Sequence, residues 1–304
     1  MQRFERFEAI QQLDPVRDNC EICRQLAGYE FPWDITRSLE LALFRTFCAP
    51  SIAALLDRTG EFHHRPQKRY DDTGLMVSLI LKLGHDTPQG QTVIQRMNRI
   101  HGHFPIRNED FLYVLSTFIY EPVRWLERFG WRPLSPLEQE ALFHFWRAIG
   151  QQMQIQSIPN SYAEFEAYNL AFEAEHFHYS PANQRVGTST LNLFLSWFPP
   201  PLRPLIRPGV YAIMDDRMIR AFGFPQPSER QRQIVATLLR SRGNLVRALP
   251  PRQTPDFYSD APQRSYPHGY TLPDLGPPTL LPTLNQGESD AIANPSANQS
   301  SDPA

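Results

Sequence analysis

Apolar side chains recur three or four residues apart through most of this 304-residue chain, and no run alternates strictly between apolar and polar residues. The first spacing is typical of amphipathic α-helices and the second of strands. Residues 88–103 and 111–126 carry clear helical stripes, and residues 73–83 are apolar nearly all round, which predicts a buried helix. The sequence therefore predicts an all-α fold, a single multi-helix bundle without a sheet.

The expected helix boundaries rest on capping residues. Three serines are each followed three residues later by Glu or Gln, the capping-box pattern: Ser135 with Glu138, Ser161 with Glu164 and Ser228 with Gln231. We expect a helix to begin after each serine. Gly243 predicts the end of the last helix, because glycine is favoured at the residue that follows a helix.

Composition changes near residue 250. Residues 251–304 hold ten of the 29 prolines and carry six acids and two bases, a charge of −4. Chains rich in proline and poor in apolar residues seldom bury enough surface to fold. We therefore predict a folded domain over 1–250 and a disordered, Pro-rich acidic tail over 251–304, whose deletion costs little stability. The alternative is that the leucines of PDLGPPTLLPTL lie in a surface groove.

Charge and hydropathy limit the partners and the location. The formal net charge of −2 offers no basic field for nucleic acid. The charged start is no signal peptide, no apolar stretch reaches about 18 residues, and three cysteines build no disulfide framework, so we expect a cytoplasmic protein. We expect the apolar stretch 193–210, LFLSWFPPPLRPLIRPGV, to form the entrance to a substrate cavity, a segment in peripheral contact with a membrane, or a buried turn between helices.

One histidine stands out by its position. His101 lies four residues after Met97 on the apolar stripe of its helix, whereas His103 is rotated by about 200° and faces outward. Such a histidine is either a core residue or a single axial ligand to a haem iron, which needs one imidazole in an apolar pocket. The absence of a CxxCH motif excludes covalently attached haem.

The segment QKRYDDTGLM, residues 67–76, stands at the entrance to the predicted buried helix. Asp71 and Asp72 read as caps for the helix 73–83, since carboxylates favour the positive end of a helix. Arg69 and Thr73 are four residues apart and share a face if the helix starts early. A guanidinium and a hydroxyl on one face could bind a polar oxygen species or a haem propionate.

Three segments carry a family resemblance: QKRYDDTGL (67–75), MNRIHGHFPIRNEDFLYVL (97–115) and FGWRPLSPLEQEALFHFWRAIG (129–150). Together they resemble the haem-dependent oxygenases that include latex-clearing rubber oxygenases and MpaB-type oxygenases. The resemblance makes His101 the metal ligand on the proximal side of the haem and places Arg69 and Thr73 on the distal, catalytic side. Asp72 stands where rubber oxygenases have a lysine, so the resemblance makes it a third candidate for the catalytic group; an aspartate at this position argues against rubber cleavage itself.

The resemblance implies a haem b cofactor, dioxygen and an apolar, isoprenoid-like or lipid-like substrate whose carbon–carbon double bond is cleaved. Arg99 and Arg107 flank His101 and are candidates for binding the haem propionates.

Two other functional classes stay open. Di-iron oxygenases are also helical bundles and use Glu-x-x-His pairs, which occur here as Glu61–His64 and Glu173–His176. Alternatively, the chain is a non-catalytic haem-binding or helical interaction domain. The aspartate at position 72, in place of the lysine of rubber oxygenases, is consistent with this class.

Overall fold

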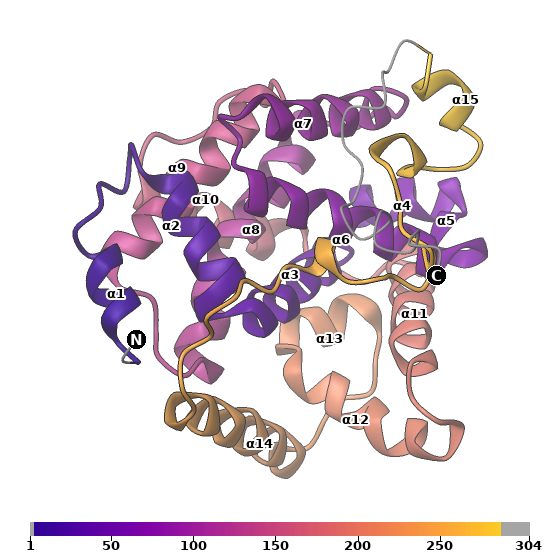
Figure 1. The fold of residues 1–304 in the computed structure, drawn as a ribbon. Coiled ribbons are helices and arrows are strands. Elements are labelled where there is room, and N and C mark those ends of the chain that lie inside the picture. Colours follow the sequence, from indigo (N-terminus) through magenta and orange to yellow (C-terminus); the bar gives the residue numbers. More distant parts are fainter. Residues whose placement is uncertain (1–2, 287–304) are drawn as a thin grey trace, which may run out of the picture.

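The computed structural model describes residues 3–286, which form helices and connecting segments without a named strand (Figure 1). The prediction of an all-α fold is confirmed. In chain order the elements are α1 (Glu5–Ile10), α2 (Asn19–Gln25), η1 (Leu26–Glu30), α3 (Pro32–Thr46), α4 (Pro50–Thr59), α5 (Glu61–His64), α6 (Pro66–Leu83), α7 (Pro88–His101), α8 (Asn108–Phe129), α9 (Pro136–Gln152), α10 (Tyr162–His176), α11 (Pro181–Ser196), η2 (Pro200–Leu202), α12 (Arg203–Ile213), α13 (Asp216–Phe222), α14 (Glu229–Ala248), η3 (Tyr258–Asp260), η4 (Leu272–Asp274) and α15 (Leu281–Leu284).

The centre of the bundle is the pair α3 and α8, which pack against each other along their lengths. Most of α8 is buried. Trp125 of α8 donates a hydrogen bond from Nε1 to Asp34 of α3 at 3.1 Å, and Arg45 of α3 pairs with Glu121 of α8 at 3.0 Å. Polar contacts near both ends of α3 therefore fix its position against the second half of α8.

Helix α6 begins at Pro66, seven residues before the predicted start. Proline suits the first turn of a helix, because the amide that it lacks has no partner there. Asp71 and Asp72 consequently lie inside the helix, and the prediction that they cap it is wrong. The second half of α6 is buried, in agreement with its apolar sequence.

The capping serines behave largely as predicted. Ser135 and Ser228 form complete capping boxes, and Ser161 accepts the amide of Glu164. The predicted end at Gly243 is wrong, since α14 continues to Ala248. A Cβ at position 243 would lie 2.6 Å from the carbonyl oxygen of Phe129, so this glycine lets α14 approach the end of α8.

Residues 251–286, the C-terminal segment, are packed on the bundle. Five of their apolar side chains are buried: Phe257, Tyr270, Leu272, Leu275 and Leu284. The expectation of a solvated tail is therefore wrong for this segment, and the groove alternative describes it better. The prediction from composition failed because a few buried side chains and polar contacts are enough to hold this segment, although it has no continuous apolar stripe like that of an amphipathic helix. The predicted disorder of residues 287–304 lies outside the described residues.

The C-terminal segment crosses η1 and α6 and ends beside α7 (Figure 1). Two glycines make room for its aromatic rings. A Cβ at Gly28 would lie 2.6 Å from the ring of Phe257, and a Cβ at Gly74 would lie 2.8 Å from the ring of Tyr258. At its far end, the fully buried Arg96 of α7 donates to the carbonyl oxygens of Pro273 and Leu275. The segment thus ties together α6 and α7, the helices that carry Arg69 and His101.

Candidate active site

An apolar cavity of about 230 Å³ lies between α3, α6, α11, α12 and the start of the C-terminal segment. Aromatic rings form much of its wall: Phe44, Phe62, Phe118, Trp125, Phe194 and Trp197. Its polar groups come mainly from α3 and from the first two turns of α6. A cavity of this kind fits an apolar ligand whose orientation depends on a few polar side chains.

Arg69 and Thr73 both line this cavity. They share a face of α6, as predicted for an early helix start, and Nη1 of Arg69 donates a hydrogen bond to the Thr73 hydroxyl. No carboxylate of the described residues forms an ion pair with Arg69, and burial lowers the pKa of its guanidinium. Arg69 is half-buried, and the charges of Asp72 and Glu61 act on it without forming an ion pair, so its guanidinium keeps N–H donors for an anionic or strongly polar ligand beside it.

His101 is the last residue of α7, a helix that packs against α6. Its ring lies 5.3 Å from the ring of Phe111, and its Nδ1 is buried without a hydrogen-bond partner. Burial and the nearby positive charge of Arg69 lower the pKa of His101 to about 4, so the ring is neutral at pH 7. His103 is exposed, as predicted.

These properties of His101 fit an axial haem ligand. Iron is bound by the neutral form of imidazole, and a ring nitrogen buried without a partner is unusual in a folded protein. His101 does not itself line the cavity; its link to the cavity is Arg69, whose charge acts on the imidazole. The structure therefore brings Arg69, Thr73 and His101 into one region.

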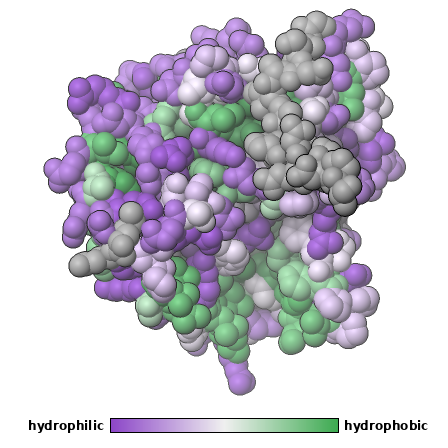
Figure 2. All heavy atoms as spheres, viewed as in Figure 1, coloured by the Kyte–Doolittle hydropathy of each residue, from purple (hydrophilic) through white to green (hydrophobic). Residues whose placement is uncertain are grey.

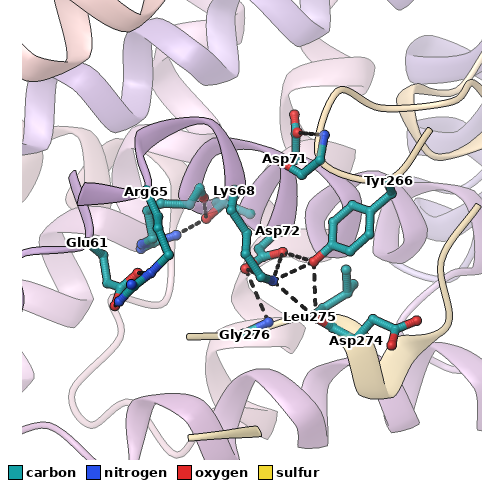
Figure 3. Close-up of polar contacts among 12 residues, drawn as sticks. Glu61, Arg65, Lys68, Asp71, Asp72, Tyr266, Asp274, Leu275 and Gly276 are labelled. Carbon is teal, nitrogen blue, oxygen red and sulfur yellow. Dashed lines mark hydrogen bonds and ion pairs between the residues drawn. The ribbon is translucent and has the colours of Figure 1, made fainter. Parts of the chain in front are cut away.

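Asp72 is engaged elsewhere (Figure 3). Its carboxylate contacts Nζ of Lys68 at 3.0 Å, the Tyr266 hydroxyl at 2.5 Å and the Gly276 amide at 3.2 Å. Burial raises the pKa of Asp72, while Tyr266 and Lys68 oppose that effect. Asp72 is not among the residues lining the cavity, so the structure places it apart from Arg69 and Thr73.

The two arginines beside His101 differ in their surroundings. Arg107 precedes α8 and is held by Asp110 at 2.8 Å and by Glu109, so carboxylates of the chain already balance its charge. Arg99 donates to the backbone oxygen of Gln286 at 3.0 Å. Their binding of haem propionates stays a prediction.

Glu40 is a cavity residue that sequence reasoning missed. It forms an ion pair with Arg37 at 2.7 Å and accepts a hydrogen bond from the Tyr70 hydroxyl. All three residues line the cavity, and burial raises the pKa of Glu40 to about 7. In the sequence, Arg37 and Glu40 look like an ordinary surface pair on a helix, and only the fold places them at the cavity.

The ligands of the di-iron alternative do not come together. Glu61 pairs with Arg65 at 2.7 Å, and Glu173 pairs with Arg45 at 3.0 Å. Within residues 3–286, no group of three or more His, Cys, Asp or Glu side chains is arranged to hold a metal ion. The geometry thus removes the basis for a di-iron site in this part of the chain.

Residues 38–248 match the family model described as "ER-bound oxygenase mpaB/B'/Rubber oxygenase, catalytic domain". The chain belongs to this family. It is 27% identical to the ER-bound oxygenase mpaB' of Penicillium brevicompactum over 324 residues, covering 84% of this chain and 76% of the relative. It is also 27% identical to the ER-bound oxygenase mpaB of Penicillium roqueforti (strain FM164), covering 66% and 74%.

Membership confirms the resemblance read from the sequence and supports an oxygenase, which is an oxidoreductase. The matched residues include the whole of α6, α7 and α8 but end before the C-terminal segment. In residues 3–286 no single helix is long and apolar enough to cross a membrane, although α3 and α4 meet that test as a pair bent by 96°.

Proposed function

We propose that this protein is a haem b-dependent oxygenase in which His101 binds the iron. The observation that carries the proposal is the neutral imidazole of His101, with a buried Nδ1 that lacks a partner and with the Arg69 cation nearby. When bound, haem supplies an iron that takes up dioxygen and carries the oxidation of the substrate.

Arg69 and Thr73 are proposed to form the polar part of the active site, where their donors stabilise negative charge that develops during the reaction. The guanidinium offers charged N–H donors, and the threonine hydroxyl keeps Arg69 turned along the cavity wall. Donors fixed in place before the reaction stabilise developing negative charge without reorganising. The apolar remainder of the wall orients the substrate and excludes water.

The proposed substrate is an apolar molecule with a carbon–carbon double bond, of isoprenoid or lipid type. Its support is the aromatic lining of the cavity, which offers few polar partners outside α3 and α6. Oxidative cleavage of such a bond consumes one dioxygen and produces two carbonyl groups, so the balanced reaction needs no external reductant.

Haem retention tests the proposal. The full chain, purified and reconstituted with haemin, is expected to show a Soret band that His101→Ala abolishes while helical content is kept. His103→Ala is the matched control, because that ring lies two residues away and is exposed. A normal Soret band in His101→Ala, or its loss in His103→Ala, would contradict the assignment.

Turnover separates the enzyme from a haem-binding domain without catalysis. With unsaturated isoprenoid or lipid substrates, the reconstituted chain should consume one dioxygen for every two carbonyl groups formed. A haem-loaded chain that takes up no oxygen with any of these substrates would instead support the non-catalytic alternative.

A further inference from the structure

A second group of polar side chains lines the cavity in addition to Arg69 and Thr73. Arg37 and Glu40 lie one turn apart on α3, and Tyr70 of α6 donates a hydrogen bond from its hydroxyl to Oε1 of Glu40. We call Arg37, Glu40 and Tyr70 the α3 polar cluster. The proposed oxygenase chemistry makes no use of this cluster.

The α3 polar cluster has hydrogen-bonding atoms that the chain leaves unused. Nη2 of Arg37 and the hydroxyl of Tyr70 both contact Oε1 of Glu40, the first at 2.7 Å. Within residues 3–286, Oε2 of Glu40 accepts no hydrogen bond and Nη1 of Arg37 donates none, and neither atom is closed off from a neighbouring ligand. A carboxylate accepts up to about four hydrogen bonds. The cluster therefore offers one free acceptor and one free donor.

The accessible surface of this ion pair faces the cavity. The side chains of Arg37 and Glu40 are 25% and 22% exposed, and both line the cavity wall. Glu40 nevertheless lies deep enough in the protein for burial to raise the pKa of its carboxyl to about 7. A carboxylate on the outer surface would be solvated by bulk water and would show no such rise.

Aromatic rings hold the cluster in place. The ring of Tyr70 packs against the rings of Trp197 at 4.9 Å and Tyr258 at 6.0 Å, and both of these residues also line the cavity. The Tyr70 hydroxyl therefore meets Glu40 from a fixed direction. Polar groups that are fixed by packing give a binding site its specificity.

The α12 side of the cavity is apolar. Val210 and Ile213 of α12 and the following Met214 line it, and none of them has a charged or hydroxyl-bearing side chain. Figure 2 shows apolar surface on the outside of the molecule too, over the part of this view where α12 and α14 lie. A ligand with one polar and one apolar end thus fits with its polar end at α3 and its apolar end toward α12.

The charges of the cluster favour a neutral polar group on the ligand. Arg37 and Glu40 carry opposite charges at 2.7 Å and largely cancel each other. A ligand carboxylate would be repelled by Glu40, and a ligand ammonium group would be repelled by Arg37. A hydroxyl group both donates and accepts hydrogen bonds, so it matches the free acceptor and the free donor together.

We propose that the α3 polar cluster binds the hydroxyl group of an amphiphilic substrate, an isoprenoid or lipid alcohol whose apolar chain lies along the aromatic wall. Oε2 of Glu40 accepts a hydrogen bond from that hydroxyl, and Nη1 of Arg37 donates one to its oxygen. Arg69 and Tyr70 are consecutive on α6 and leave the helix about 100° apart, so the hydroxyl and the reacting double bond contact different parts of the wall. Like the oxygenase function on which it rests, this assignment takes the cavity to be the substrate site.

Equilibrium dialysis of the full chain with farnesol tests the assignment. The comparison ligands are the methyl ether of farnesol, which has no hydroxyl proton to donate, and farnesoic acid, which has a carboxylate instead. Wild type should bind farnesol about tenfold more tightly than the methyl ether, because the ether leaves Oε2 of Glu40 unpaired. Arg37→Met/Glu40→Leu replaces the ion pair by apolar side chains, a change that folding commonly tolerates, and it should bind farnesol and the ether alike.

Arg24→Met/Glu21→Leu is the matched control. That pair has the same spacing on α2 and the same 2.7 Å contact, but it does not line the cavity, so the preference for farnesol should stay as in wild type. Three results would each overturn the assignment: no preference for farnesol over the ether in wild type, tighter binding of farnesoic acid than of farnesol, or equal loss of the preference in both double variants.

The wild-type comparison needs no variant, so the assignment stays testable if Arg37→Met/Glu40→Leu does not fold. Dialysis also needs no bound haem. A chain with the expected Soret band and no preference for farnesol refutes the hydroxyl assignment alone. A chain that prefers farnesol and shows no Soret band after reconstitution refutes the haem proposal alone.

Discussion

Helix α6 has two polar faces: the segment face, toward the C-terminal segment, and the cavity face, toward the cavity. Their charged residues differ in whether they have partners within the chain. On the face toward the C-terminal segment, Lys68 pairs with Asp72, and Asp71 accepts hydrogen bonds from Gln67 of α6 and from Tyr258 of the segment (Figure 3). On the cavity face, Arg69 has a threonine hydroxyl and an aromatic ring beside it but no carboxylate. Direct pairing with carboxylates and with the C-terminal segment indicates a structural contact, whereas a half-buried cation that forms no ion pair and faces a cavity indicates a site for a ligand.

The comparison also explains the departure from the rubber-oxygenase pattern at position 72. An aspartate there accepts hydrogen bonds from Tyr266 and from the Gly276 amide, which a lysine could not do. In this chain, Asp72 therefore holds the C-terminal segment against α6. Substitutions on the segment face should affect stability, and those on the cavity face should affect reactivity.

Deletion of residues 251–304 should have the largest effect. It exposes the apolar surface under five buried side chains and leaves the buried Arg96 without its carbonyl partners. We expect the melting temperature in a calorimetric scan to fall by about 10 °C or more. Deletion of 287–304 alone is the control and should change it little. Two deletions with equally small effects would show that the segment does not stabilise the bundle.

Asp72→Ala should cost about 2–3 kcal/mol of unfolding free energy, because Lys68 loses its carboxylate and two donors of the segment lose their acceptor. Denaturant unfolding measures this loss. Glu175→Ala, an exposed acid on α10, should stay within about 0.5 kcal/mol of wild type. The haem-loaded Asp72→Ala variant should keep its rate per haem, and a large loss of rate would return Asp72 to the catalytic group.

Glu40→Gln should change how stability depends on pH. The folded pKa of about 7 lies above the usual 4.5, so the folded state binds more protons and Glu40 lowers stability as pH rises from about 4.5 to 7. Relative to wild type, the unfolding free energy of Glu40→Gln should therefore be higher at pH 8 than at pH 5, by about 2–3 kcal/mol. Unfolding at both values measures this, and parallel pH profiles of variant and wild type would refute the burial argument.

Arg69→Ala should change stability least but reduce oxygen reactivity per bound haem by about 10²–10³-fold. Thr73→Val should act in the same direction and more weakly, since a hydroxyl forms an uncharged hydrogen bond. Without the Arg69 charge, the pKa of His101 in the haem-free chain should also rise, which NMR titration detects. If Arg69→Ala loses haem but keeps its turnover per haem, Arg69 binds a propionate and is not catalytic.

Local patterns predicted much of this molecule. The spacing of apolar residues predicted the helices, and Ser135 and Ser228 predicted where α9 and α14 begin. The four-residue spacing of Arg69 and Thr73 predicted that they share a face. These features depend on neighbours along the chain, where spacing alone is informative.

Long-range contacts explain the failures. Asp72 finds its partners 194 and 204 residues away, at Tyr266 and Gly276, so no local pattern distinguishes an aspartate that holds a distant segment from one that caps a helix. Glu40 acquires its raised pKa only when α3 is placed against the cavity. Gly243 ends no helix, because its role is set by the approach of α8.

Chemical complementation of His101 tests the central claim most directly. His101→Gly removes the ring at the last residue of α7, where glycine is tolerated near a helix end. The variant should lose the Soret band, and added imidazole should restore it by entering the space left by the ring. Haem bound by His101→Gly without imidazole, at the stoichiometry and with the spectrum of wild type, would contradict the assignment of His101 as the axial ligand.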